Sequence, residues 1–187
     1  MKTLNPLSKS LLTITTTASL LLMPIVSYAA VDMFLEIDGI VGESYDKDNR
    51  GAMDILAWSE GLSQSGSFQT GGGGAGKANF QDINFTKWLD SASPALRLSV
   101  ANGQHIPTAT LTVRRAGANP SQYFKIEMKN IIVTSVSSGG SGGDDRLTEN
   151  ITLNFAEVTW TYYPIDEGGN PKPPISVGWN IAENKQL

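Results

Sequence analysis

A glycine-rich run at residues 71–77 comes nearest to a recognised chemical motif. Its letters, GGGGAGK, satisfy the G-x-x-x-x-G-K spacing of loops whose backbone amides and lysine hold nucleotide phosphates. Such a loop also needs a serine or threonine for magnesium and a helix that presents its N-terminal amides. Here Ala78 takes the hydroxyl position, and residues 79–85 have the composition of a strand. The run is interpreted as a flexible loop, and nucleotide binding is not expected.

The other residues suited to catalysis lack the partners they need. The single histidine, His105, is expected in a loop, and no G-x-S-x-G sequence supplies a nucleophile for it. Asp144 and Asp145 lack the spacing of a calcium loop, and Arg146 and Glu149 follow them. This order favours charge pairs at the mouth of a hairpin. The sequence therefore predicts a protein that is not an enzyme and holds no cofactor and no metal.

The composition narrows the classes of function further. The chain has 187 residues, with 18 acidic and 14 basic side chains, no cysteine and an isoelectric point near 4.9. An acidic chain offers no overall positive field to a phosphate backbone, so nucleic acid is not an expected partner. The lack of cysteine excludes disulfide frameworks, thiol nucleophiles and thiolate metal sites. A chain of this length fits one domain with a sizeable core.

The first 29 residues have the layout of a secretory signal peptide. Two lysines precede an uncharged run over residues 11–26, and Ser27 and Ala29 place small residues at positions −3 and −1 of a cleavage site. An uncleaved membrane anchor is the alternative, but the run is rich in threonine and shorter than the ~20 residues that a span needs. We expect residues 1–29 to be a signal peptide, residues 30–187 to form one domain, and no stable membrane insertion.

The elements that must position any functional residue are mainly strands. Apolar and acidic residues alternate over residues 31–37, which is typical of a half-buried strand. Six further strand-like stretches cover residues 53–59, 78–89, 108–115, 122–136, 150–163 and 175–181. One short helix is expected over about residues 94–101, with Ser93 as N-cap and Gly103 in the stop. The chain is predicted to be all-β, a compact barrel or sandwich of about eight or more strands with one short flanking α-helix.

The last long stretch changes the parity of its apolar residues. Ile151, Leu153 and Phe155 share one parity, whereas Val158 and Trp160 have the other. A bulge near residues 156–157 would keep both sets on the core face.

Several blocks, taken together, resemble the Hcp family, the hemolysin-coregulated proteins that form the tubes of bacterial type VI secretion systems. They include AVDMFLEIDG at residues 30–39, QDINFTK at residues 81–87 and GWNI at residues 178–181. The most specific block is GGSGGDDRLTENITLNF at residues 139–155. The resemblance extends over nearly all of residues 30–181 and is more specific than any single motif in the chain.

The resemblance implies a barrel protomer that assembles into homohexameric rings, stacked into an exported tube. The implied partners are further copies of the chain, a spike protein at the tip and effector proteins carried in the lumen. In similar proteins an extended loop after the second strand bears on stacking, and here it is assigned to about residues 42–51, the most charged segment. The implied interface residues are Tyr45, Asp46, Lys47, Asp48 and Arg50. Ser59 is implied near the inner wall, as a contact for cargo.

The implied location has two versions. Family members normally begin near residue 30 and leave through their own apparatus, which implies a secreted protein. The predicted signal peptide at residues 1–29 implies the periplasm as the alternative. The alternative function is a periplasmic or extracellular barrel that binds a ligand such as carbohydrate, since exposed aromatic rings stack on sugars and the chain has four tryptophans.

Overall fold

The structure is a computed structural model and describes residues 31–67, 74–117 and 120–187. The predicted signal peptide and residues 71–73 of the glycine-rich run lie outside these ranges. The elements in chain order are β1 Val31–Ile37, β2 Met53–Ser59, β3 Leu62–Ser63, β4 Gly66–Ser67, β5 Gly74–Ala75, β6 Asn79–Phe80, β7 Ile83–Trp88, α1 Ser93–Asn102, β8 His105–Arg115, β9 Ser121–Gly139, β10 Thr148–Tyr162, β11 Ile175–Asn180 and β12 Lys185–Gln186.

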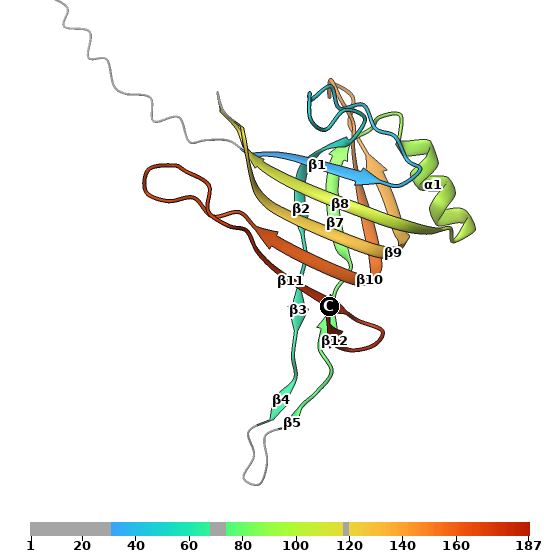
Figure 1. Cartoon of the computed structure of the whole chain (residues 1–187). Helices are drawn as coiled ribbons and strands as arrows, with labels where there is room; N and C mark the ends of the chain where they lie inside the picture. The colour runs from blue at the N-terminus through green and yellow to red at the C-terminus, as the bar shows by residue number, and fades with distance from the viewer. Residues whose placement is uncertain (1–30, 68–73, 118–119) are drawn as a thin grey trace, which may run out of the picture.

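Eight of these strands form one antiparallel sheet that closes on itself (Figure 1). The strand order is β12-β11-β10-β7-β2-β1-β8-β9, and β9 also pairs with β10. The six strands from β10 to β9 therefore form a barrel, and β11 and β12 extend the sheet beyond it. Closure leaves the backbone groups of these strands paired on both sides, which removes the exposed edges of an open sheet. The predicted all-β barrel with one short helix is confirmed.

The long strand β10 holds the barrel and its extension together. One edge of it pairs with β9 along its length, while the other edge pairs first with β7 and then with β11. Val158 is buried and Trp160 packs against the core, so both sets of apolar residues reach it, as predicted. The ladder with β9 shows no register shift at residues 156–157, and its one shift, between Thr152 and Leu153, comes from an extra residue on β9. The parity changes where β10 exchanges β7 for β11.

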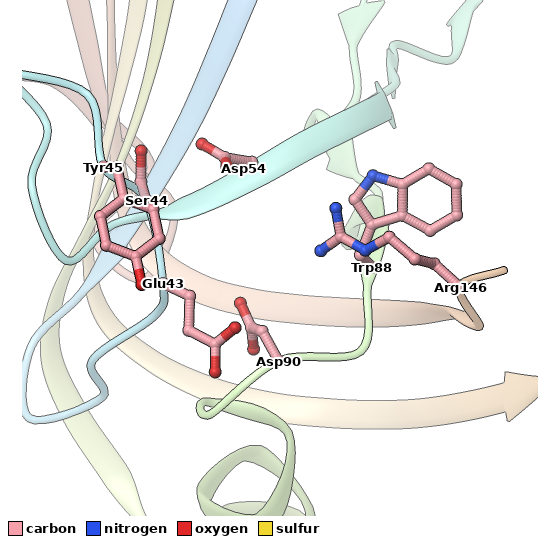
Figure 2. A pocket seen from close by; sticks show the side chains of 7 residues that line it. All are labelled: Glu43, Ser44, Tyr45, Asp54, Trp88, Asp90 and Arg146. Carbon is pink, nitrogen blue, oxygen red and sulfur yellow. The ribbon is translucent and has the colours of Figure 1, made fainter.

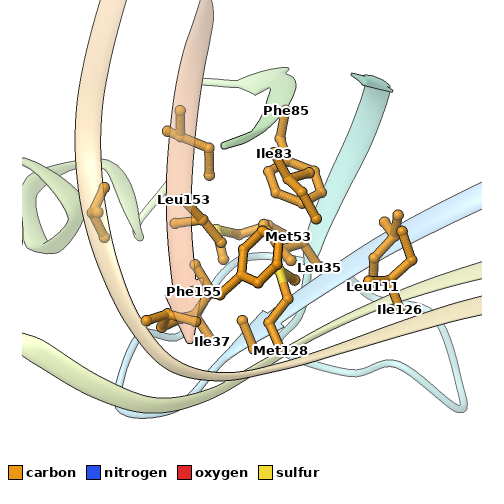
Figure 3. Packing of buried hydrophobic residues seen from close by; sticks show 14 of the residues in the cluster. Leu35, Ile37, Met53, Ile83, Phe85, Leu111, Ile126, Met128, Leu153 and Phe155 are labelled. Carbon is orange, nitrogen blue, oxygen red and sulfur yellow. The ribbon is translucent and has the colours of Figure 1, made fainter. Parts of the chain in front are cut away.

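The barrel interior is an apolar core to which every barrel strand contributes (Figure 3). Every second side chain of a strand points inward, so the alternate apolar residues of the sequence form the core. Its fully buried members include Leu35, Met53, Ile83, Leu111, Ile126 and Ile151. Burying a side chain of this size contributes roughly 1.5–3 kcal/mol, and this group is the main source of stability.

Helix α1 packs on one side of the barrel against β9 (Figure 1). Pro94 stands in its first turn, where a missing backbone N–H costs nothing. Gly103 ends it with φ 65°, as predicted, a conformation that glycine adopts without strain. The helix begins one residue earlier than predicted, so Ser93 is within it and Ala92 is the N-cap. The hydroxyl of Ser93 serves another purpose, described below.

A two-stranded arm leaves the barrel at the ends of β2 and β7 (Figure 1). It is built from the short ladders β3–β6 and β4–β5, which continue one after the other away from the barrel. The arm lies between β2, the second strand of the chain, and β7, and its described residues are 60–67 and 74–82.

Candidate functional site: two ends and a polar wall

The charged segment at residues 42–51 is a folded loop between β1 and β2. The amide of Gly42 donates to the carbonyl of Gly51 at 2.7 Å, and the amide of Gly51 donates to Ser44 at 3.0 Å. The side chains of Ser44 and Asn49 are buried. These bonds hold the segment on the barrel end.

Asp46 fixes this loop to strand β8. Its carboxylate accepts two hydrogen bonds from the guanidinium of Arg114, at 2.6 and 3.1 Å, and one from Asn49 at 2.8 Å. The hydrogen bond from Arg114 is the main reason why the pKa of Asp46 lies well below its ordinary value. Arg114 also donates to Asp32 at 3.0 Å and stacks over the ring of Phe34. A two-pronged arginine–carboxylate bond fixes orientation as well as distance.

The five residues assigned to the interface thus divide into two groups. Asp46 is turned inward and holds the loop. Tyr45, Lys47, Asp48 and Arg50 are exposed, and 88% of Tyr45 is accessible to solvent. Within the part of the chain that the structure describes, neither Lys47 nor Arg50 takes part in an ion pair.

The assignment of the extended loop to residues 42–51 needs correction. This segment follows β1, the first strand, and lies against the barrel. The segment that follows the second strand is the arm at residues 60–82, and it is the one that protrudes (Figure 1). Charge density directed the prediction to residues 42–51, whereas the arm is mostly glycine, serine and other small residues. The loop and the arm lie at opposite ends of β2.

Ser59 belongs to a row of polar side chains that crosses four strands. It pairs with Asn84, Asn84 pairs with Thr152, and Thr152 pairs with Ser135. Paired residues of neighbouring strands point to the same face, so the four side chains lie side by side outside the barrel. The residues between them, such as Phe85 and Leu153, point into the core.

One further row, made of Thr86, Asn150 and Ser137, and the side chain of Asn154 extend this surface, which we call the polar wall. Its members on β2, β7, β9 and β10 are Ser59, Asn84, Thr86, Ser135, Ser137, Asn150, Thr152 and Asn154. Neighbouring side chains bond to each other: Thr86 donates to Asn150 and Thr152 donates to Asn84, both at 2.7 Å. Asn154 and Thr134 both donate to the carboxylate of Asp82. The wall is neutral apart from Asp82, and its asparagine and threonine side chains are hydrogen-bonded.

A small polar cleft lies beside the loop at residues 42–51 (Figure 2). It measures about 130 Å³ and is lined by Glu43, Ser44, Tyr45, Asp54, Trp88, Asp90 and Arg146. The guanidinium of Arg146 lies 5.0 Å from the centre of the Trp88 ring. Sequence reasoning missed Trp88, which precedes the helix on β7 and gave no motif. Four charged side chains, Glu43, Asp54, Asp90 and Arg146, thus lie around one cleft at the loop end of the barrel.

A buried charge cluster lies beneath this cleft, at the start of helix α1. Lys87 and Glu149 are fully buried and 2.9 Å apart, and Lys87 also contacts Asp90 at 2.6 Å. The hydroxyl of Ser93 donates to Glu149 at 2.6 Å. The predicted charge pairing of Glu149 with its neighbours at the hairpin mouth is therefore wrong. It bridges β10 to the helix instead, and Arg97 approaches its second oxygen at 3.2 Å.

The residues considered for catalysis do not come together. His105 is the first residue of β8, where it pairs with Ile132, and is not in the loop expected for it. Asp144 accepts hydrogen bonds from Ser141, which lower its pKa, and it caps a turn. Within residues 31–67, 74–117 and 120–187, no three His, Cys, Asp or Glu side chains are grouped to hold a metal ion. No helix among the described residues is long and apolar enough to cross a membrane.

Comparison with known proteins gives one consistent result. The family model described as "Type VI secretion system effector, Hcp" matches residues 34–162. Protein hcp1 of Pseudomonas aeruginosa is 51% identical over 160 residues, which cover 84% of this chain and 99% of that protein. A solved type six secretion system protein superposes with a TM-score of 0.79 at 30% identity, covering 84% of this chain and all of that one.

Hcp1 from Salmonella typhimurium superposes with a TM-score of 0.70 at 34% identity, covering 84% of this chain and 99% of that one. The family match includes all of β2, β7, β8, β9 and β10, together with the loop at residues 42–51, the arm and the polar wall. The chain belongs to the Hcp family of type VI secretion proteins.

Proposed function

We propose that this type VI secretion tube protein acts as a structural subunit, six copies forming a ring and the rings stacking into an exported tube. The observation that carries the proposal is the 51% identity to hcp1 over almost the whole of that protein, on a closed barrel. A barrel with two different ends suits head-to-tail contacts, which close into rings or continue along an axis. The wall of such a tube needs rigid surfaces rather than a reactive centre, and we propose that the chain has no enzymatic activity.

The polar wall is the surface proposed to face the lumen, with Ser59 among the residues that contact cargo. Its hydroxyl and amide groups already bond to each other across β7 and β10. A neutral surface on which most polar side chains are already hydrogen-bonded binds passing side chains weakly and reversibly. This chemistry suits a channel that carries different effector proteins and releases them.

The exposed residues of the loop at residues 42–51 are proposed to contact neighbouring copies. Tyr45, Lys47, Asp48 and Arg50 face solvent, and Asp46 supports them by fixing the loop to Arg114. The further partners proposed are a spike protein at the tube tip and the effectors.

Deleting the gene for this chain should abolish release of type VI effectors into the medium, and reintroducing it should restore release. Unchanged release in the deletion strain would contradict the proposal.

Residues 1–29 are proposed to be a cleaved signal peptide, which would send the chain to the periplasm, with the domain at residues 30–187. Charge, apolar run and small residues follow the order that secretory signals require. N-terminal sequencing of the protein from cytoplasm, periplasm and medium tests this. A start at Ala30 in the periplasm supports it, whereas an intact Met1 in the medium refutes cleavage.

A further inference from the structure

An apolar groove lies where the arm joins the barrel extension. It measures about 250 Å³ and has only apolar surface. Its lining comes from β3, β6, β10 and β11: Leu62, Ala78, Phe80, Trp160, Val177, Gly178 and Trp179. The rings of Phe80 and Trp160 stack with centres 6.4 Å apart. Leu62 is 58% exposed and Val177 49% exposed, so the groove is open to solvent.

A single carboxylate stands beside this groove. Glu60 accepts the indole N–H of Trp160 at 2.9 Å, and it forms no ion pair with any residue that the structure describes. Partial burial raises the pKa of Glu60. A half-buried carboxylate without a cation is an unfavourable arrangement for an isolated protomer. A positive group from outside the protomer would relieve it, so the groove suits an apolar side chain that has a cation close by.

The loop at residues 42–51, at the other end of β2, carries both an apolar side chain and a cation. Tyr45 is the most exposed large apolar side chain among the described residues, and Lys47 follows two positions later without an ion pair there. The Asp46–Arg114 bond holds the loop in place, so little conformational freedom is lost when it docks. Of the acids that flank Lys47, Asp46 is neutralised by this bond, and Asp48 lies 3.7 Å from the same guanidinium.

We propose that the loop of one copy docks in the groove of a second copy, with Tyr45 seated among Leu62, Phe80 and Trp160 and Lys47 facing Glu60. This inference rests on the proposed function, because it assigns residues to contacts within the tube. Loop and groove lie at opposite ends of a seven-residue strand, so the contact is head-to-tail and does not close between two copies. A head-to-tail contact either closes a ring or repeats along an axis, and we assign this one to the axis, where it joins one ring to the next.

The contact has the make-up of an interface hot spot. One aromatic side chain fills an apolar pocket, its hydroxyl stays at the polar rim, and a charge pair stands at the edge. Tyr45→Ala should weaken ring-to-ring association at least about tenfold and leave each ring intact. The reversal Glu60→Lys should weaken it as well, and adding Lys47→Glu should restore much of the loss, since the pair is then reversed.

Cysteine cross-linking tests the juxtaposition directly, because the natural chain has no cysteine. The double variant Tyr45→Cys with Leu62→Cys should give a ladder of disulfide-linked multimers after mild oxidation of assembled protein. Within one copy the two positions are separated by the length of β2, about 20 Å, far beyond the reach of a disulfide. The control pairs Tyr45→Cys with Leu98→Cys, which is 62% exposed on helix α1.

The outcomes separate this inference from the proposed function. A ladder from the Leu62 pair alone supports the docking. Stacked rings without that ladder, or with an equal ladder from the Leu98 control, refute the docking and leave the tube function standing. If the natural chain forms no rings at all, the proposed function itself is wrong.

Discussion

Arg114 is the residue on which the loop end of the barrel depends most. It bonds to Asp46 and Asp32 and lies over the ring of Phe34, with only 12% of its side chain exposed. Arg114→Met keeps much of the apolar contact but leaves two carboxylates without their cation. We expect a loss of about 2 kcal/mol in the free energy of unfolding, measured by urea titration.

The matched control is Arg50→Met, in the same loop but exposed and outside any ion pair of the described residues. It should change stability by less than about 0.5 kcal/mol. Equal unfolding midpoints for the two variants would show that Arg114 does not anchor the loop.

Asp46 should make the loop end sensitive to acid. Its pKa in the folded protein is lowered, chiefly by the hydrogen bond from Arg114, so the folded state favours the ionised carboxylate. The resulting stability is complete above the unfolded pKa of about 3.9 and is lost as pH falls through the folded pKa. Urea titrations from pH 7 to pH 2 should show the natural chain losing its advantage over Asp46→Asn below about pH 4. A constant difference across that range would contradict this assignment.

At the scale of elements, the buried charge cluster determines how helix α1 sits on the barrel. Lys87 and Glu149 are fully buried partners, and Ser93 ties Glu149 to the first turn of the helix. Removing one partner leaves an uncompensated buried charge, so Lys87→Met should cost about 3–5 kcal/mol. The double variant Lys87→Met with Glu149→Leu should recover part of that loss, because Asp90 is then the one carboxylate of the cluster that still lacks Lys87.

Thermal unfolding of the single and double variants measures this coupling. If the double variant is as unstable as the single one, the cluster does not act as a pair. Ser93→Ala removes one hydrogen bond to Glu149 and should cost only about 1 kcal/mol.

The alternation of residues along β7 and β10 predicts this cluster, although the charge of its members suggests the surface. Glu149 has the parity of Ile151 and Leu153, and Lys87 has that of Ile83 and Phe85, so alternation places both charges inward. Because Glu149 follows Asp144 and Arg146 in the sequence, it was predicted to pair with such neighbours at the surface. Alternation predicts the direction of a side chain, whereas proximity in sequence does not predict its partner.

The strands and the helix could be predicted because each has a local pattern. The strand Met53–Ser59 was predicted with its observed bounds, and Gly103 marked the helix end. The bulge, the arm and the docking of the loop on Arg114 depend on contacts between residues far apart in the chain. Asp46 and Arg114 are 68 residues apart, and no local pattern relates them.

At the scale of the whole molecule, the barrel presents three different surfaces. The arm protrudes at one end of β2, and the loop at residues 42–51 lies at the other end (Figure 1). The apolar groove lies at the arm end, and the polar wall crosses strands β2, β7, β10 and β9. Two unlike ends favour repeated head-to-tail contacts, and a neutral side suits a lumen. These surfaces would supply the contacts and the lining that the proposed tube requires.

The most direct test is the number of copies in the assembled particle. Electron microscopy of the purified protein, combined with its mass under native conditions, measures this number. We predict hollow rings of six copies that stack end to end at high protein concentration. A particle that stays a single copy at every concentration, with no ring in the images, would contradict the assignment as a tube subunit.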